Sequence, residues 1–146
     1  MRDLRGHVRT KTALEIDGPM TSHKQCESTA VLLIAHGSRR PAANEDLARL
    51  ADLVRERNVY DMVEISYLEL ADPTIPQAAR TCLSRGATRV LMLPYFLSAG
   101  AHVTSDLGRH RRELSEEFPD ADFMLCPPLG LHPLLVEVVF ERLREV

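Results

Sequence analysis

AVLLIAHGS, residues 30–38, is a run of apolar side chains that ends in small, turn-forming residues. A run without polar alternation is typical of a strand that is buried on both faces, as in a parallel sheet. A helix is predicted directly after it, at residues 42–57, because Leu47 and Leu50 recur at helical spacing and Pro41 suits a first turn. The folded part of the chain is therefore expected to open with a buried strand and a helix.

The same pairing of a strand with a helix recurs along the rest of the chain. Further strands are predicted at residues 62–70, 88–97 and 121–130, and further helices within residues 71–86 and at residues 106–118 and 133–146. Short crossovers of this kind impose a parallel sheet with right-handed connections. We therefore expect an α/β fold, a single domain at residues 29–146 with a four-stranded parallel sheet flanked by helices in the order βαβαβαβα.

Residues 1–28 do not share this pattern. They mix charged residues with Gly18, Pro19 and several serines and threonines, and they show no sustained period. We expect them to form a flexible extension outside the domain. Two explanations stay open: the extension has a regulatory role, or translation starts at Met20.

The composition narrows the classes of partner. With 146 residues, 45% of them hydrophobic and 27% charged, the chain resembles soluble globular domains. A net charge of −3 supplies no excess of positive charge for a phosphate backbone, and 5% aromatic residues offer few platforms for stacking bases. No apolar run reaches the length of a membrane-spanning helix. We therefore expect neither nucleic acid nor a membrane as partner.

The cysteines indicate the compartment. Cys26, Cys82 and Cys126 lie far apart and form no CxxC pair, so neither a zinc ribbon nor a disulfide framework is predicted. Sparse, unpaired cysteines fit a reducing environment. The sequence therefore predicts a cytoplasmic protein.

Three residues with metal-binding and proton-accepting side chains follow the first three predicted strands. His36 follows the first, Glu69 the second and His102 the third, so all three are expected at the carboxyl edge of the sheet, where open α/β sheets bind ligands. Imidazole and carboxylate groups suit Fe, Co, Ni or Zn, and three ligands leave positions open for substrate. A lone histidine at such a position is more often a hydrogen-bonded loop residue than a ligand. The hypothesis of a shared site therefore rests on finding all three residues at the same edge of the sheet.

Four ordered segments give the chain a specific resemblance. LLIAHGSRRPAANE, YLELADPTIPQA, LPYFLSAGAHVTSD and PPLGLHPLL occur in this order from Val31 to the C-terminus. They resemble the small, single-module sirohydrochlorin cobaltochelatases and ferrochelatases of the class II chelatase superfamily. The residues at 1–28 depart from that family's pattern, because family members begin only a few residues before the first strand.

The resemblance implies an activity and a set of site residues. It implies a chelatase that inserts a divalent metal, Co²⁺ or Fe²⁺ with Ni²⁺ as a further candidate, into sirohydrochlorin or a related tetrapyrrole, in cobalamin or siroheme synthesis. The metal is then a substrate and no organic cofactor is needed. His36 and His102 are implied as catalytic histidines that contact the metal, Glu69 as their acidic partner, and a homodimer as the assembly.

A tetrapyrrole is flat, apolar and edged with carboxylates, which suggests further binding residues. Ser38, Arg39 and Arg40 directly follow His36 and are candidates for binding an anionic group of the substrate. Tyr95, Leu97 and Val103 lie near His102 in sequence and are candidates for an apolar wall. The arginines at residues 109–112 could pair with carboxylates of the substrate, but a solvated helix face explains them and His110 at least as well.

Two rival functions are open to the sequence. A metal-binding or tetrapyrrole-carrier protein would use the same three residues without turnover. A nucleotide-binding module is ranked far lower, because the chain has neither GxGxxG nor GxxxxGK[ST].

Overall fold

Strand β1 (Thr29–Ala35) lies at the centre of the sheet in the computed structural model, which describes residues 27–146. It pairs in parallel with β2 (Met62–Tyr67) and with β3 (Arg89–Pro94), and β4 (Asp122–Leu125) pairs with β3, so the strand order is β2-β1-β3-β4. Neighbours on both edges and helices on both faces bury the middle of β1, which accounts for its uninterrupted apolar sequence.

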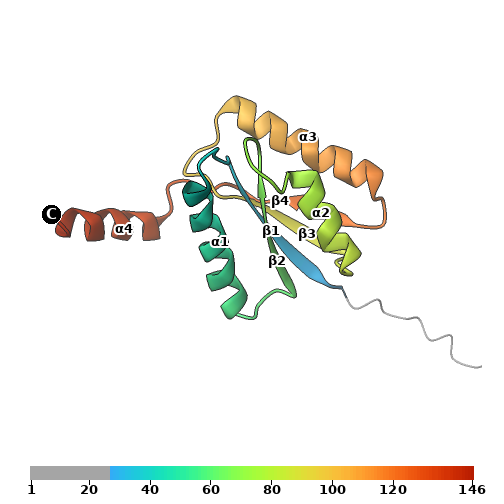
Figure 1. Ribbon diagram of the computed structural model, residues 1–146, viewed down its shortest axis with the longest axis horizontal. Coiled ribbons are helices and arrows are strands. Elements are labelled where there is room, and N and C mark those ends of the chain that lie inside the picture. Colours follow the sequence, from blue (N-terminus) through green and yellow to red (C-terminus); the bar gives the residue numbers. More distant parts are fainter. Residues whose placement is uncertain (1–26) are drawn as a thin grey trace, which may run out of the picture.

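The helices cover the two faces of the sheet unequally (Figure 1). The helices that follow the first three strands are α1 (Pro41–Glu56), α2 (Ile75–Ser84) and α3 (Ala101–Glu117). The chain steps from β1 to β2 in one direction and then passes back across β1 to β3 and β4. Right-handed crossovers therefore place α1 on one face and α2 with α3 on the other. Among residues 27–146, no helix is long and apolar enough to cross a membrane.

Each face of the sheet has its own hydrophobic core. Val31 and Leu33 point to the face of α1, where they pack with Leu47. Leu32 and Ile34 point to the opposite face and pack with residues of α2 and α3. The alternation of side chains along β1 thus holds both helical layers on one strand.

The fourth helix, α4 (Pro133–Arg144), behaves differently from the other three. It projects away from the sheet (Figure 1), and none of its residues is buried. His132 caps it by accepting a hydrogen bond from the backbone N–H of Leu134 at 3.2 Å. The predicted α/β fold and its βαβαβαβα order are confirmed, but the fourth helix does not flank the sheet of its own chain.

One boundary correction bears on the site. The helix predicted from residue 106 begins at Ala101, because Gly100 adopts an extended N-cap conformation and Thr104 donates its hydroxyl to the Gly100 carbonyl at 3.1 Å. The prediction was wrong in placing His102 in a loop. His102 lies instead in the first turn of α3.

The predicted strands were too long at their carboxyl ends. The second strand ends at Tyr67 rather than at residue 70, where Leu70 has a left-handed φ of 64°. The third ends at Pro94, after which the N–H of Tyr95 makes one further bond to the carbonyl of Ile34 at 2.7 Å. The fourth stops at Leu125, two residues before Pro127. The last helix ends at Arg144 rather than at residue 146.

The extension predicted at residues 1–28 lies almost wholly outside the described residues. Of its last two residues, Ser28 accepts hydrogen bonds through its carbonyl from the backbone N–H groups of Thr88 (2.9 Å) and Arg89 (3.1 Å). The backbone of Ser28 is therefore already bonded to the start of β3.

Removing a side chain at the centre of the sheet should have a large effect on stability. Leu32 is 0% exposed and Leu53 is 59% exposed, so Leu32→Ala should lower the free energy of unfolding by about 2–5 kcal/mol and Leu53→Ala by less than about 0.5 kcal/mol. Urea denaturation followed by circular dichroism measures both. Equal effects of the two substitutions would contradict the assignment of β1 to the core.

Candidate active site

The loops after β1 and β2 remain hydrogen-bonded to each other beyond the ends of the strands. The N–H of Leu68 donates to the carbonyl of Ala35 at 2.9 Å, and the N–H of Glu69 donates to the carbonyl of His36 at 3.0 Å. These bonds hold the backbones of His36 and Glu69 side by side. Their side chains meet as well, with Nε2 of His36 3.3 Å from Oε1 of Glu69.

Gly37 makes this close approach of the two loops possible. Its φ is +95°, and a Cβ atom built on it would lie 1.9 Å from the carbonyl oxygen of Glu69. Any other residue would therefore push the Glu69 backbone away and would also adopt a strained conformation. The close packing of the His36 and Glu69 loops therefore requires a glycine at position 37.

The His36 and Glu69 side chains are open to solvent. They are 57% and 56% exposed, so the pair is accessible to a ligand from outside. The ring of Phe96, from the loop after β3, meets the His36 ring edge-on, with centroids 6.5 Å apart. The imidazole therefore has both an aromatic and a carboxylate neighbour.

His102 completes the arrangement from the other side of β1. It lines a cavity of about 210 Å³ together with His36 and Glu69. The other residues that line this cavity are Leu68, Val103, Asp106, Arg109 and His110. The cavity lies at the carboxyl ends of the strands, where the chain order reverses around β1, which is where open α/β sheets bind ligands. The structure thus brings together the three residues that sequence reasoning selected.

These three residues do not form a closed metal shell. Within residues 27–146, no group of three or more histidine, cysteine, aspartate or glutamate side chains lies close enough to hold a metal ion. His36 and Glu69 are in contact, while His102 borders the same cavity from α3. Such an arrangement suits transient binding of a metal more than permanent storage.

The structure does not bring the other candidate binding residues to the cavity. Ser38 accepts a hydrogen bond through its hydroxyl from the backbone N–H of Arg40 at 3.1 Å and so shapes the turn before α1. Arg39 and Arg40 are exposed and lie outside the cavity lining. Their role in binding an anionic substrate stays a prediction.

Only part of the expected apolar wall is found. Val103 lines the cavity, whereas Tyr95 and Leu97 are 40% and 68% exposed and lie outside its lining. Leu68, which sequence reasoning missed, is the second apolar residue of the lining. It reaches the cavity because the hydrogen bond to Ala35 draws the loop after β2 over the end of β1.

Sequence reasoning also undervalued one face of α3. Asp106 was not selected as a site residue, and Arg109 and His110 were explained at least as well by a solvated helix face, yet all three line the cavity. The available signal was their spacing, because Asp106 and His110 follow His102 at i+4 and i+8 on the helix. Burial lowers the pKa of His110 and favours its neutral imidazole.

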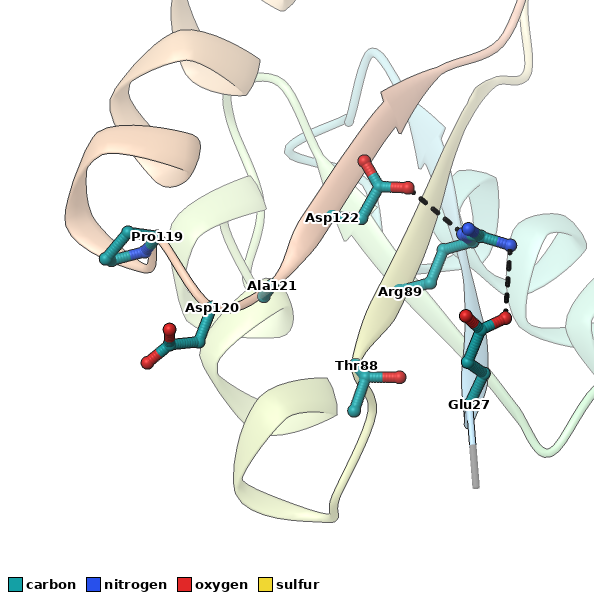
Figure 2. Close-up of a pocket in the computed structure, with 7 residues that line it drawn as sticks. All are labelled: Glu27, Thr88, Arg89, Pro119, Asp120, Ala121 and Asp122. Carbon is teal, nitrogen blue, oxygen red and sulfur yellow. Dashed lines mark hydrogen bonds and ion pairs between the residues drawn. The ribbon is translucent and has the colours of Figure 1, made fainter. Parts of the chain in front are cut away.

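A larger cavity lies at the opposite, amino-terminal edge of the sheet. Its volume is about 480 Å³, and Figure 2 shows Arg89 between the carboxylates of Glu27 and Asp122, at 3.9 and 3.0 Å. The remaining lining residues are Thr88, Pro119, Asp120 and Ala121. It contains no histidine or cysteine, and its arginine is neutralised by carboxylates. Size alone would favour this cavity, but the reactive side chains favour the smaller one.

Known proteins match nearly the whole described domain. A family model described as CbiX matches residues 30–146. The chain is 33% identical over 118 residues to a chloroplastic sirohydrochlorin ferrochelatase from Arabidopsis thaliana, covering 81% of this chain and 52% of the relative. It is 45% identical over 80 residues to a sirohydrochlorin cobaltochelatase from Methanocaldococcus jannaschii, covering 55% of this chain and 56% of the relative. The chain thus spans about half the length of these relatives in the matched regions.

Solved structures share the fold. A cobalamin biosynthesis CbiX protein from Marinobacter aquaeolei VT8 superposes with a TM-score of 0.70 at 26% identity, over 80% of this chain and 95% of the other. The sirohydrochlorin chelatase SirB from Bacillus subtilis subspecies spizizenii, in complex with cobalt, gives a TM-score of 0.76 at 27% identity, over 82% of this chain and 51% of the other.

Gly37→Ala tests the contact between the two loops. The added methyl group collides with the Glu69 carbonyl and the left-handed φ becomes strained, so the free energy of unfolding should fall by about 2 kcal/mol or more. Gly108→Ala is the matched control, because a Cβ there meets only Arg112 at 3.5 Å and a helix interior prefers alanine. Denaturant melts compare the two variants. A Gly37→Ala protein as stable as the wild type would refute the close packing.

Proposed function

Because the chain belongs to the CbiX family, we propose that it is a chelatase that inserts a divalent metal ion into sirohydrochlorin or a closely related tetrapyrrole. The names of the relatives, sirohydrochlorin cobaltochelatase and ferrochelatase, support this activity. The observation that carries the proposal is the meeting of His36, Glu69 and His102 at one solvent-open cavity at the carboxyl edge of the sheet.

The reaction requires bases and metal ligands at one place. Insertion forms bonds between the metal and the ring nitrogens, removes the protons of the pyrrole N–H groups and strips water from the metal ion. Neutral imidazoles donate a lone pair to a metal or accept a proton near neutral pH, and a carboxylate does both. A cavity that holds two imidazoles and a carboxylate therefore contains the groups that both parts of the reaction need.

The contact between His36 and Glu69 suggests separate roles for the two side chains. A carboxylate 3.3 Å from Nε2 favours a proton on that nitrogen, which leaves the lone pair on Nδ1. Glu69 then orients the imidazole, and Nδ1 of His36 is the atom that contacts the metal or takes a pyrrole proton. His102 acts from the first turn of α3, across the cavity.

The proposed metal is Co²⁺ or Fe²⁺. Histidine and carboxylate ligands accept both ions, and Ni²⁺ as well, so the ligand set alone does not choose among them. Cobalt insertion would serve cobalamin synthesis and iron insertion would serve siroheme synthesis. The names of the relatives cover both metals.

Metal insertion by the purified protein tests this proposal. We expect the protein to accelerate insertion of Co²⁺ or Fe²⁺ into sirohydrochlorin under anaerobic conditions, measured by tetrapyrrole absorbance against a control without enzyme. His36→Ala and His102→Ala should each reduce the enzyme-dependent rate by about 10²-fold or more, because each removes a base and a ligand.

His132→Asn is the matched control for these histidine variants. It removes an imidazole outside the cavity and keeps a good N-cap residue for α4, so its rate should equal that of the wild type. Tight binding of sirohydrochlorin without any acceleration would favour the carrier protein instead.

The size of the cavity supports a second proposal, that the protein acts as a homodimer. At about 210 Å³ the cavity is smaller than the roughly 300–1,000 Å³ of typical small-molecule sites, and a tetrapyrrole is a large ligand. One copy would therefore contact only part of the ring. The chain covers 52% of the Arabidopsis relative and 51% of the SirB chain, so about half of each of those polypeptides lies outside the match.

Two apolar surfaces among the described residues support the same proposal. Helix α4 exposes Val136, Val139, Phe140 and Leu143 at i, i+3, i+4 and i+7, each at least 51% exposed. On the sheet face of α1, Leu91 and Leu93 of β3 are partly buried and Met124 of β4 is 48% exposed, and all three share the face of Val31 and Leu33 by strand register. We propose that α4 of each copy packs on this part of its partner's sheet.

Phe140→Glu tests the proposed dimer. The wild type should scatter light with about twice the mass of the 16.4-kDa chain, and Phe140→Glu should shift the mass toward that of one chain, because a charge at the centre of an apolar contact is not tolerated. Glu141→Lys, on the polar face of the same helix, should leave the mass unchanged. A wild-type protein with the mass of one chain would mean that α4 folds back onto its own domain.

A further inference from the structure

His110 occupies an unusual position on α3. The side of the helix that faces the core carries Val103, Leu107 and Leu114, and His110 falls on the same stripe at helical spacing. Its side chain is only 16% exposed, against 57% for His36. A polar ring thus takes a place that the pattern reserves for an apolar residue.

One nitrogen of this ring has no partner. Among the described residues, Nδ1 of His110 is buried without a hydrogen bond, and the nearest carboxylate oxygen, Oε2 of Glu113, is 3.8 Å away. Buried polar atoms in native proteins are nearly always hydrogen-bonded, because the loss of water otherwise destabilises the fold. An unsatisfied atom at the edge of a cavity therefore calls for a functional explanation.

His110 is the last of three metal-binding side chains along one face of α3. His102, Asp106 and His110 lie at i, i+4 and i+8, and all three line the cavity that contains His36 and Glu69. Ligands four residues apart on a helix point the same way and can share one metal ion, as the two histidines of a zinc-binding HExxH helix do. The face leads from the exposed His102 to the more buried His110.

We propose that Asp106 and His110 form a holding site for the divalent metal substrate, from which the ion passes through His102 to the His36–Glu69 pair. This inference rests on the proposed chelatase function. The ligand atoms are a carboxylate oxygen of Asp106 and Nε2 of His110. The N–H group at Nδ1 then donates a hydrogen bond to Glu113 after a small movement of the Glu113 side chain. This is the carboxylate–histidine–metal arrangement of many metal sites.

The present contacts of the two carboxylates are compatible with metal binding. Arg109 contacts Asp106 at 3.4 Å and Glu113 at 3.3 Å, and all three side chains are about half exposed. These distances exceed the roughly 2.7–2.9 Å of strong charge-assisted hydrogen bonds. A divalent cation can therefore displace Arg109 from Asp106 at little cost.

The number of ligands suits transfer. Asp106 and His110 supply two donors, and the described residues contain no three-donor cluster that would retain the ion. Two protein ligands leave most of the coordination shell to water, so the ion stays exchangeable. A row of such pairs on one helix moves the metal toward the reacting ring without trapping it.

His110→Leu distinguishes this role from a structural one. If His110 only packs the core, the substitution should leave metal binding unchanged. If it is a metal ligand, leucine should fit the apolar stripe, remove the unsatisfied nitrogen and maintain or raise the melting temperature, while metal binding weakens. Glu113→Gln keeps the size of the side chain and should weaken binding about tenfold, as loss of an outer-shell carboxylate does.

The experiment titrates Co²⁺ alone into the full-length, metal-free protein without tetrapyrrole. Calorimetry gives the Kd, and the visible absorption bands of Co²⁺ report nitrogen ligation. We expect His110→Leu to raise the Kd at least tenfold and to diminish the bands, with His132→Asn, an imidazole outside the cavity, equal to the wild type. In the insertion assay, the KM for Co²⁺ should rise while the KM for sirohydrochlorin stays constant.

The outcomes separate the two proposals. Unchanged Co²⁺ affinity and an unchanged KM for Co²⁺ in His110→Leu would overturn the holding site, even if the wild type proves to be a chelatase. Weakened Co²⁺ binding in His110→Leu together with no insertion by the wild type would support the metal site and reject the chelatase. A change only in the KM for sirohydrochlorin would also overturn it, because His110 would then contact the tetrapyrrole.

Discussion

The hydrogen bond from the N–H of Glu69 to the carbonyl of His36 holds the site together, and Gly37 allows the approach that this bond requires. It continues the β1–β2 pairing past the end of the sheet, so the rigidity of a buried parallel sheet extends to two solvent-exposed side chains. The imidazole and the carboxylate are therefore positioned through their backbones, although both are more than half exposed. A site held in this way is open to a large ligand without being loose.

The crossovers of the sheet decide what surrounds this pair. The strand that follows β1 in sequence, β2, lies on one side of β1, and β3 lies on the other. The loop after β3 and the first turn of α3 therefore lie beside the loop after β1. Phe96 and His102 thereby reach the same region as His36. Since α3 packs along the sheet, its polar edge extends the site down the helix, where Asp106 and His110 line the same cavity as His102.

Two features of the domain are incomplete in one copy. The cavity is small for the proposed tetrapyrrole, and among the described residues α4 and Met124 of β4 expose apolar side chains. Helix α1 contacts β1 and β2, so the apolar residues of β3 and β4 on the same face lie beside it. Under the proposed function, a partner copy would supply both a helix for this face and a second wall for the tetrapyrrole.

Much of the fold was determined by the sequence alone. The apolar run of β1, the helical spacing of Leu47 and Leu50, and the order of the elements predicted the parallel α/β sheet, because burial on both faces demands such a pattern. The positions of His36, Glu69 and His102 at one edge followed from the common direction of parallel strands. Element ends were less predictable, since Gly100 capping acts through local backbone geometry.

Only the tertiary structure decided which neighbours share the cavity. It placed Leu68, Asp106 and His110 there and left Arg39, Arg40 and Leu97 outside, because that choice depends on how loops and helix faces pack in three dimensions. It also showed that none of the residues of α4 is buried in the part of the chain that the structure describes, which an amphipathic sequence pattern does not reveal. A pattern states that a helix has an apolar face, but the partner of that face is set by contacts between segments distant in the chain.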